Sequence, residues 1–119
     1  MTNLLVGADP EFWLLDRNGK PVSASEVLPG TKQKPYNVSS GAVQSDGLAA
    51  EINIIPAGSK DMFVHNIHEV LSYIIMSYNM KLSFAATMDF DKAYMAKLPS
   101  KVKALGCDPD FNPYDAEVN

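Results

Sequence analysis

The feature that most constrains the fold is a change of hydrophobic period near residue 56. Residues 48–55 alternate between polar and apolar, so Glu51 and Asn53 share one face of a predicted strand and isoleucines take the other. A Pro-Ala-Gly break follows, and Ser59 is a suitable N-cap. Beyond it, apolar residues recur at helical spacing. This stripe consists of Ile67, Val70, Leu71, Ile74, Ile75 and Tyr78. The sequence therefore predicts a strand followed by a long amphipathic helix that covers the back of a sheet.

The first third of the chain indicates further β structure. Residues 4–7 and 12–16 are short apolar runs. Asn18-Gly19 is a strong tight-turn signal, and residues 21–23 follow it as the returning segment. We therefore expect a hairpin in this region.

A second pair of strands is expected around Asp46-Gly47, at residues 42–44 and 48–55. Together these patterns predict an α+β fold, an antiparallel sheet with a long amphipathic helix packed on one face. The residues expected to be largely buried are Trp13, Leu15, Ile52, Ile54, Ile67, Leu71, Ile74, Ile75 and Tyr78.

The other segments carry weaker patterns. Residues 28–40 are rich in Pro, Gly, Lys and Ser and predict an exposed loop, which can be a binding loop or lid, or a plain connection. Residues 82–88 indicate another strand, and residues 89–103 a short helix with a linker. The tail at residues 112–119 is expected to be irregular.

Composition restricts the class of protein. The 119 residues suit a single domain spanning 1–119, and 46% hydrophobic with 20% charged residues is ordinary for a globular protein. A net charge of −4 does not attract nucleic acid or an anionic membrane. No apolar run spans a bilayer, no basic signal segment opens the chain, and one cysteine fits a reducing compartment. We expect a cytoplasmic protein.

Arginine is scarce in this sequence. There is one arginine, Arg17, against fourteen acidic residues, and no Gly-rich phosphate-binding motif is present. Phosphate groups are usually held by several cations or by backbone amides. If the chain acts on ATP, metal ions or another segment must therefore supply the positive charge.

The leading candidates for a site are oxygen-bearing side chains on the predicted strands. Asp9 and Glu11 point the same way in an extended segment, as do Glu51 and Asn53, and Asp46 lies at the turn between strands. If the strands are neighbours, these groups converge on one face and suit magnesium or manganese. The alternative is that they are solvated acids at turns.

Three other reactive side chains favour structural interpretations. His65 and His68 are spaced for a shared ligand, but no third nitrogen ligand accompanies them, so a solvated pair is expected. Cys107 stands beside Asp108, which would raise the thiol pKa and oppose nucleophilic reactivity. We expect Cys107 to be structural.

Three segments together resemble one protein family. They are Gly-Ala-Asp-Pro-Glu-Phe at residues 7–12, Ser-Asp-Gly-Leu-Ala-Ala-Glu-Ile-Asn at residues 45–53, and Ala-Leu-Gly-Cys-Asp-Pro-Asp-Phe-Asn at residues 104–112. The first and third also share the form Gly-x-Asp-Pro-acid-Phe, which either chance or shared turn chemistry explains. The chain resembles the phage-type carboxylate–amine (COOH·NH2) ligases, relatives of glutamate–cysteine ligase in the glutamine-synthetase-like superfamily.

The resemblance implies a fold, a reaction and a set of ligands. It implies an antiparallel sheet with the site on its inner face, ATP with Mg²⁺ or Mn²⁺, and an acyl phosphate that an amine converts to an amide. By resemblance, Glu11 and Glu51 look like metal ligands. The remaining matched residues look like substrate-binding positions, namely Asp9, Asp46, Asn53 and Asp108. No catalytic residue is assigned.

The sequence departs from the family in one large respect. Family members run to about twice this length, and their second half brings a His-x-His strand and basic residues toward the nucleotide. The resemblance therefore implies the N-terminal part of a ligase that is inactive alone. It would associate with a protein partner or with itself through the open edge of the half-domain. The alternatives are a non-enzymatic, phage-encoded inhibitor or anti-defence protein in the host cytoplasm, and a dimerising interaction module.

Overall fold

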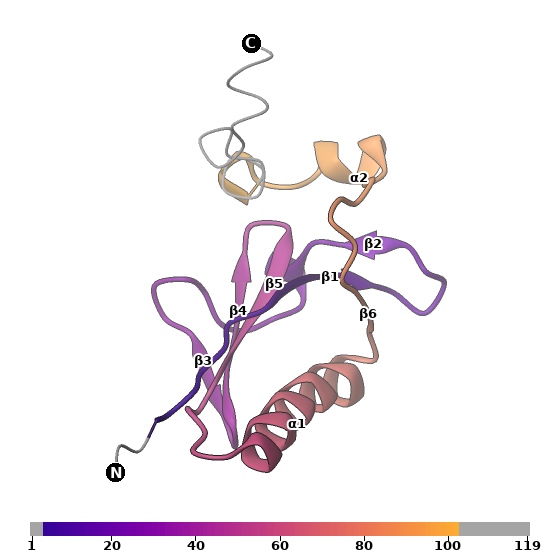
Figure 1. Cartoon of the computed structure of the whole chain (residues 1–119). Helices are drawn as coiled ribbons and strands as arrows, with labels where there is room; N and C mark the ends of the chain where they lie inside the picture. The colour runs from indigo at the N-terminus through magenta and orange to yellow at the C-terminus, as the bar shows by residue number, and fades with distance from the viewer. Residues whose placement is uncertain (1–3, 103–119) are drawn as a thin grey trace, which may run out of the picture.

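The computed structural model describes residues 4–102, in which six strands form a curled antiparallel sheet and α1 lies along it (Figure 1). The strand order is β2-β1-β5-β4-β3, and β6 also pairs with β1. The strands are β1 (Glu11–Leu15), β2 (Pro21–Val22), β3 (Tyr36–Val38), β4 (Gly41–Asp46), β5 (Ala49–Ile54) and β6 (Lys81–Ser83). The helices are η1 (Ala24–Glu26), a 3-10 turn, α1 (Lys60–Tyr78) and α2 (Lys92–Ala96). The predicted α+β class is confirmed.

The β1–β2 hairpin closes at the predicted Asn18-Gly19 turn. The Asp16 amide donates to the Lys20 carbonyl at 2.8 Å, and the Asp16 carboxylate accepts from the amides of Asn18 and Lys20, both at 2.9 Å. Gly19 has φ +84°, a conformation that disfavours residues with a Cβ atom. The turn chemistry visible in the sequence therefore fixes this hairpin.

The β4–β5 hairpin is the centre of the sheet. Its register pairs Asp46 with Ala49, Gln44 with Glu51 and Ala42 with Asn53. Gly47, at φ 64°, makes the turn. This two-residue connection matches the turn predicted around Asp46-Gly47.

The loop predicted over residues 28–40 is wrong in part. Residues 36–38 form β3, which pairs antiparallel with β4 across a turn at residues 39–40. Tyr36 and Asn37 are both exposed, so this edge strand has no alternating pattern that could reveal it. Earlier in the segment, a Cβ at Gly30 would lie 2.2 Å from the Val43 carbonyl oxygen, so the loop backbone runs directly against β4.

Helix α1 begins and ends where local chemistry dictates. The Ser59 hydroxyl accepts from the Met62 amide at 3.1 Å, as an N-cap should, and Asn79 ends the helix in the left-handed region. The helix packs on β4 and β5. The side-chain amide of Asn66 donates to the backbone carbonyl of Ile55, directly after β5, at 2.8 Å. The buried core consists of Phe12, Leu14, Ala24, Leu28, Val43, Ala50, Ile52, Ile54, Val70 and Ile74.

The structure corrects the expected core at two places. In β1 the buried residues are Phe12 and Leu14, whereas Trp13 and Leu15 are only partly buried. Since side chains alternate along a strand, Trp13 shares the face of Glu11. In α1 the side chain of Ile75 is 40% exposed, so its predicted burial is wrong.

Ile75 is exposed because the buried side of α1 is narrow. That side is centred on Asn66, Val70 and Ile74, and one residue further along a helix points about 100° away. Burial is confirmed for Ile52, Ile54 and Ile74, and it is partial for Ile67, Leu71 and Tyr78.

The two ends of the described chain are less regular than predicted. Residues 4–7 make only a bridge between Val6 and Ala57, and β6 occupies just the start of the strand predicted at 82–88. The short helix predicted within 89–103 is present as α2. Cys107, Asp108 and the tail at 112–119 lie outside the described residues. No described helix has the length and apolarity needed to cross a membrane.

Candidate metal and substrate site

The polar face of the sheet carries a row of side chains across three strands. Glu11 in β1 is paired directly with Glu51 in β5, which is paired with Gln44 in β4. Because β strands alternate, the neighbouring apolar residues of these strands face the helix instead. The register therefore brings together two glutamates that are forty positions apart in the sequence.

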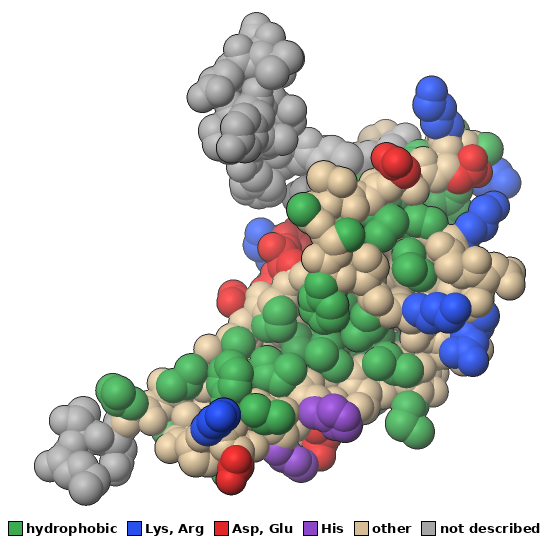
Figure 2. Space-filling model, turned by 45° about the vertical axis from the view of Figure 1, so that its right-hand side comes forward, with side chains coloured by type: hydrophobic (Ala, Val, Ile, Leu, Met, Phe, Trp, Pro, Cys, Tyr) green, Lys and Arg blue, Asp and Glu red, His purple; other side chains and the backbone are tan. Residues whose placement is uncertain are grey.

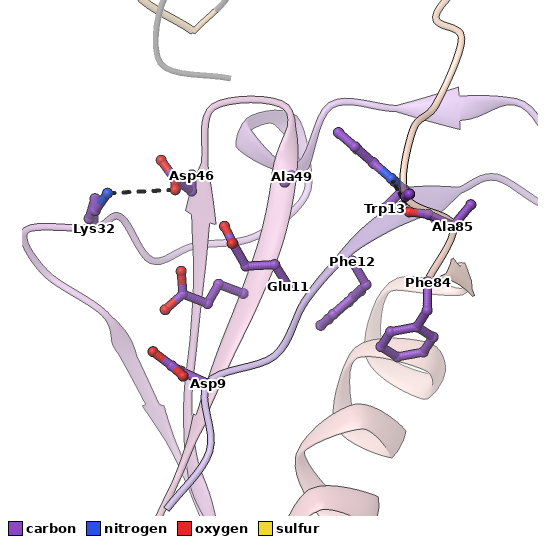
Figure 3. Close-up of a pocket in the computed structure, with 11 residues that line it drawn as sticks. Asp9, Glu11, Phe12, Trp13, Lys32, Asp46, Ala49, Phe84 and Ala85 are labelled. Atoms are coloured by element: carbon purple, nitrogen blue, oxygen red, sulfur yellow. Dashed lines mark hydrogen bonds and ion pairs between the residues drawn. The ribbon is translucent and has the colours of Figure 1, made fainter. Parts of the chain in front are cut away.

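Three carboxylates meet on this face. Ligand oxygens of Glu11, Asp46 and Glu51 all lie within 4.8 Å of one another. Figure 3 shows the side chains of Asp9, Glu11 and Asp46 on the same side of the sheet. They line an open pocket of about 830 Å³.

The opposite part of the pocket lining is apolar. Trp13, Phe84 and Ala85 lie on the β1 side, and Phe84 is 59% exposed. The Trp13 indole donates to the Ala85 carbonyl at 3.0 Å (Figure 3). Its ring packs edge-on against Phe90, with 5.8 Å between the ring centroids. The pocket thus combines an anionic end with an aromatic wall whose tryptophan is held in place.

The clustering perturbs the acids themselves. Partial burial, followed by repulsion from Asp46, raises the pKa of the Glu11 carboxyl above its usual value. Burial and then repulsion from Glu11 likewise raise the pKa of Glu51. Both glutamates are therefore held in positions that disfavour their negative charge, and a bound cation would relieve that cost.

One cation reaches the cluster. Lys32 Nζ lies 3.6 Å from Asp46 Oδ2, and Lys32 also favours the charged forms of Glu11 and Glu51 (Figure 3). Among the described residues that line the pocket, it is the single basic side chain. Four acids, counting Asp9, therefore face one lysine.

The donor set fits a divalent cation. Oxygens that bind one ion at about 2.0–2.6 Å lie at most roughly 5 Å apart, and the three carboxylates already satisfy this limit. An all-oxygen set favours Mg²⁺, Mn²⁺ or Ca²⁺ over zinc. Glu11, Asp46 and Glu51 are the residues that would hold such an ion.

The residues predicted for the site are only partly brought together. Asp9, Glu11, Asp46 and Glu51 line the pocket. Asn53 shares the face of Glu51, but its amide donates to Gln44 at 3.1 Å and it is not among the lining residues. Asp108 lies outside the described residues. Asp46, predicted at the substrate end, has a carboxylate oxygen within 4.8 Å of an oxygen of each of the two glutamates.

The lining residues that sequence reasoning missed include Lys32, Trp13 and Phe84. Lys32 lies in a segment without periodicity, so no local pattern links it to Asp46. Trp13 had a usable signal, because it stands two positions after Glu11 in a strand.

The two histidines lie away from this pocket. Both are exposed on α1, and His65 Nε2 is 3.3 Å from Glu69 Oε2. The prediction of a solvated pair agrees with this exposure.

The fold and site define an α+β protein with a cluster of carboxylates in an open pocket on the polar face of its sheet. Comparisons with protein families, with curated proteins and with solved structures gave no match. The site geometry and the sequence resemblance therefore carry the functional argument.

Proposed function

We propose that this chain is the N-terminal, carboxylate-bearing part of an ATP-dependent carboxylate–amine ligase. The observation that carries the proposal is the convergence of Glu11, Asp46 and Glu51 from three strands onto one open pocket. These residues belong to two of the three segments on which the resemblance rests. In the proposed reaction a substrate carboxylate attacks the γ-phosphorus of ATP with loss of ADP, and an amine then replaces the phosphate.

The role of the described residues is to bind and orient. Glu11 and Glu51 would hold Mg²⁺ or Mn²⁺, with Asp46 completing the set. Such an ion neutralises the phosphate oxygens during transfer. Asp9, at the edge of the pocket, would face the substrate, and we retain Asn53 and Asp108 as substrate-binding residues by resemblance alone.

We propose further that the chain does not turn over substrate by itself. A triphosphate brings several negative charges, and the described pocket offers one lysine against four acids. The missing cations would come from a partner chain or from association of two copies. We place this assembly in the cytoplasm, which is the host cytoplasm if the protein is encoded by a phage.

Exposed apolar side chains support association with another protein. Figure 2 shows hydrophobic side chains spread over the face that also carries the histidines of α1. Large exposed apolar patches often mark interaction surfaces. Across all the described residues, the exposed large apolar side chains include Leu4, Leu5, Val6, Ile55, Val64, Ile75, Met76 and Phe84. This surface also favours the second candidate, a non-enzymatic interaction module or inhibitor that keeps the sheet without catalysis.

Calorimetric titration tests the first proposal. We expect Mn²⁺ and Mg·ATP to bind the chain, and binding to be lost in Glu11→Ala/Glu51→Ala, because the cation loses two of its three carboxylates. The matched control is Asp61→Ala/Asp89→Ala, which removes two exposed acids outside this pocket and should bind like the wild type.

The result that would contradict the cation site is equal binding by the double variant and by its control. Absence of any binding at millimolar Mn²⁺ and Mg·ATP would leave the interaction module as the better account. Light scattering of the purified chain then decides whether it associates with itself.

A further inference from the structure

Lys32 is presented to the carboxylates by a loop that is fixed at its base. The Gly30 carbonyl accepts from both the backbone amide and the hydroxyl of Ser45, at 3.0 and 3.2 Å. Thr31 and Lys34 exchange backbone hydrogen bonds of 3.0 and 3.2 Å, so residues 31–34 form a tight turn. These contacts belong to a β-bridge between Thr31 and Ser45, the residues that adjoin Lys32 and Asp46. The bridge therefore positions both members of the Lys32–Asp46 pair.

The side chains of Lys32 and Asp46 differ in how far they are exposed to solvent. The Lys32 side chain is 56% exposed, whereas that of Asp46 is 14% exposed. The ammonium group stands on a flexible four-carbon stem, so it can leave Asp46 while the backbone of the turn stays in place. Because the lysine end of this 3.6 Å ion pair is exposed to solvent, its attraction is partly screened, and the ammonium group can exchange partners.

A cation in the pocket would compete directly with this lysine. Asp46 is at once the partner of Lys32 and one of the three carboxylates within 4.8 Å of one another. A divalent ion bound there would repel the ammonium group and share its carboxylate. Lys32 would then need another anion, and the open pocket is where a metal-bound ligand would present one.

We propose that Lys32 is an exchangeable counter-ion of this site, which pairs with Asp46 before a cation binds and with an oxyanion of the metal-bound ligand afterwards. The inference rests on the proposed function for the cation site itself. It adds a positioning residue from the loop at residues 28–35, outside the segments that carry the family resemblance.

This proposal predicts effects of opposite sign on two affinities. Lys32→Met removes a charge that opposes the cation, so we expect Mn²⁺ alone to bind about threefold to tenfold more tightly than to the wild type. The preformed complex of Mn²⁺ with inorganic triphosphate should bind at least about threefold more weakly, because its oxyanions lose their partner. Both affinities can be measured by calorimetry, with free Mn²⁺ followed by electron paramagnetic resonance.

Two further variants make the test specific. Lys34→Met removes an exposed lysine of the same turn that does not line the pocket, and it should change neither affinity. Lys32→Arg keeps the charge and should restore both affinities to within about twofold of the wild type. Far-ultraviolet circular dichroism confirms that each variant keeps the fold.

The outcomes separate the two proposals. If the wild type binds Mn²⁺ but Lys32→Met weakens both affinities, or leaves both unchanged, the counter-ion role is wrong and the cation site stands. Equal effects of Lys32→Met and Lys34→Met would also overturn the counter-ion role, because the change in net charge would then explain both effects. If the wild type binds no Mn²⁺, both proposals fail.

Discussion

Glu11 and Glu51 lie directly opposite each other on neighbouring antiparallel strands, where like charges destabilise the sheet. Partial burial adds to the cost and raises the pKa of both carboxyl groups. This local cost is an observation that supports the proposed cation site.

This cost makes a prediction about pH. A carboxyl whose pKa is raised in the folded state contributes stability that is fully present below its unfolded pKa, near 4.5, and is lost as the pH rises through the folded value. Glu51→Gln should therefore raise the melting temperature by a few degrees at about pH 7 and change it little at about pH 4. Calorimetric melting at both pH values measures the difference.

Glu69 supplies a control of opposite sign. Hydrogen bonds from Ser40 and Ser39 lower the pKa of its carboxyl, so its contribution is present above pH 4.5 and is lost as the pH falls through the lowered value. Glu69→Gln should accordingly lower the melting temperature at about pH 7. A higher melting temperature for both variants would instead indicate an effect of net charge and contradict our reading of Glu51.

At the scale of elements, α1 is attached to the sheet in two ways. Its apolar side covers β4 and β5, and the Glu69 carboxylate accepts from Ser39 and Ser40 at the turn between β3 and β4. The second contact joins the helix to the end of β3, an edge strand that has no buried side chain. The helix thus supports the strand that carries Asp46 from behind.

Two adjacent isoleucines test how α1 packs. Ile74 is fully buried and Ile75 is 40% exposed. Ile74→Ala should reduce the free energy of unfolding by about 2–5 kcal/mol, because it leaves a cavity against the sheet. Ile75→Ala should reduce it by about 1 kcal/mol or less.

Urea denaturation of both variants measures these changes in unfolding free energy. The two substitutions are both Ile→Ala at adjacent positions, so the losses can be compared directly. Equal losses would show that Ile75 is covered in solution, by a second copy or another partner. In that case the loss for Ile75→Ala should depend on protein concentration.

At the scale of the whole molecule, α2 lies near β2 (Figure 1), and the Tyr94 side chain joins it to the body. The Tyr94 hydroxyl accepts from the Ser23 amide at 2.8 Å and donates to the Glu26 carboxylate, next to η1. Burial, followed by the hydrogen bond to Glu26, raises the pKa of Tyr94 to about 12. This tie joins α2 to η1, and none of its three residues lines the carboxylate pocket.

Removing that tie should release α2 without damaging the site. Tyr94→Phe leaves the Ser23 amide without its partner, which costs about 1–3 kcal/mol. We expect faster hydrogen exchange at Ser23 and faster proteolysis within residues 84–91, together with unchanged Mn²⁺ affinity. Unchanged exchange at Ser23 would mean that other contacts hold α2.

Much of the fold could be predicted because its signals are local. The Asn18-Gly19 turn, the Ser59 cap and the alternation that places Glu51 and Asn53 on one face each depend on a few consecutive residues. Four acidic members of the site were also predictable, since they lie on or beside these elements. They share one pocket because β1 pairs with β5. From the sequence, that these two strands are neighbours could only be assumed.

The sequence by itself determined where the helix begins, which hairpins close, and which residues of β5 place oxygen-bearing side chains on one face. Only the tertiary structure decided that β3 forms from exposed residues, that Trp13 faces the site and that Lys32 meets Asp46. The physical reason is the range of the interactions. Turns, caps and side-chain alternation act between near neighbours in the chain, whereas strand pairing and charge clustering depend on the register between segments that meet only after folding.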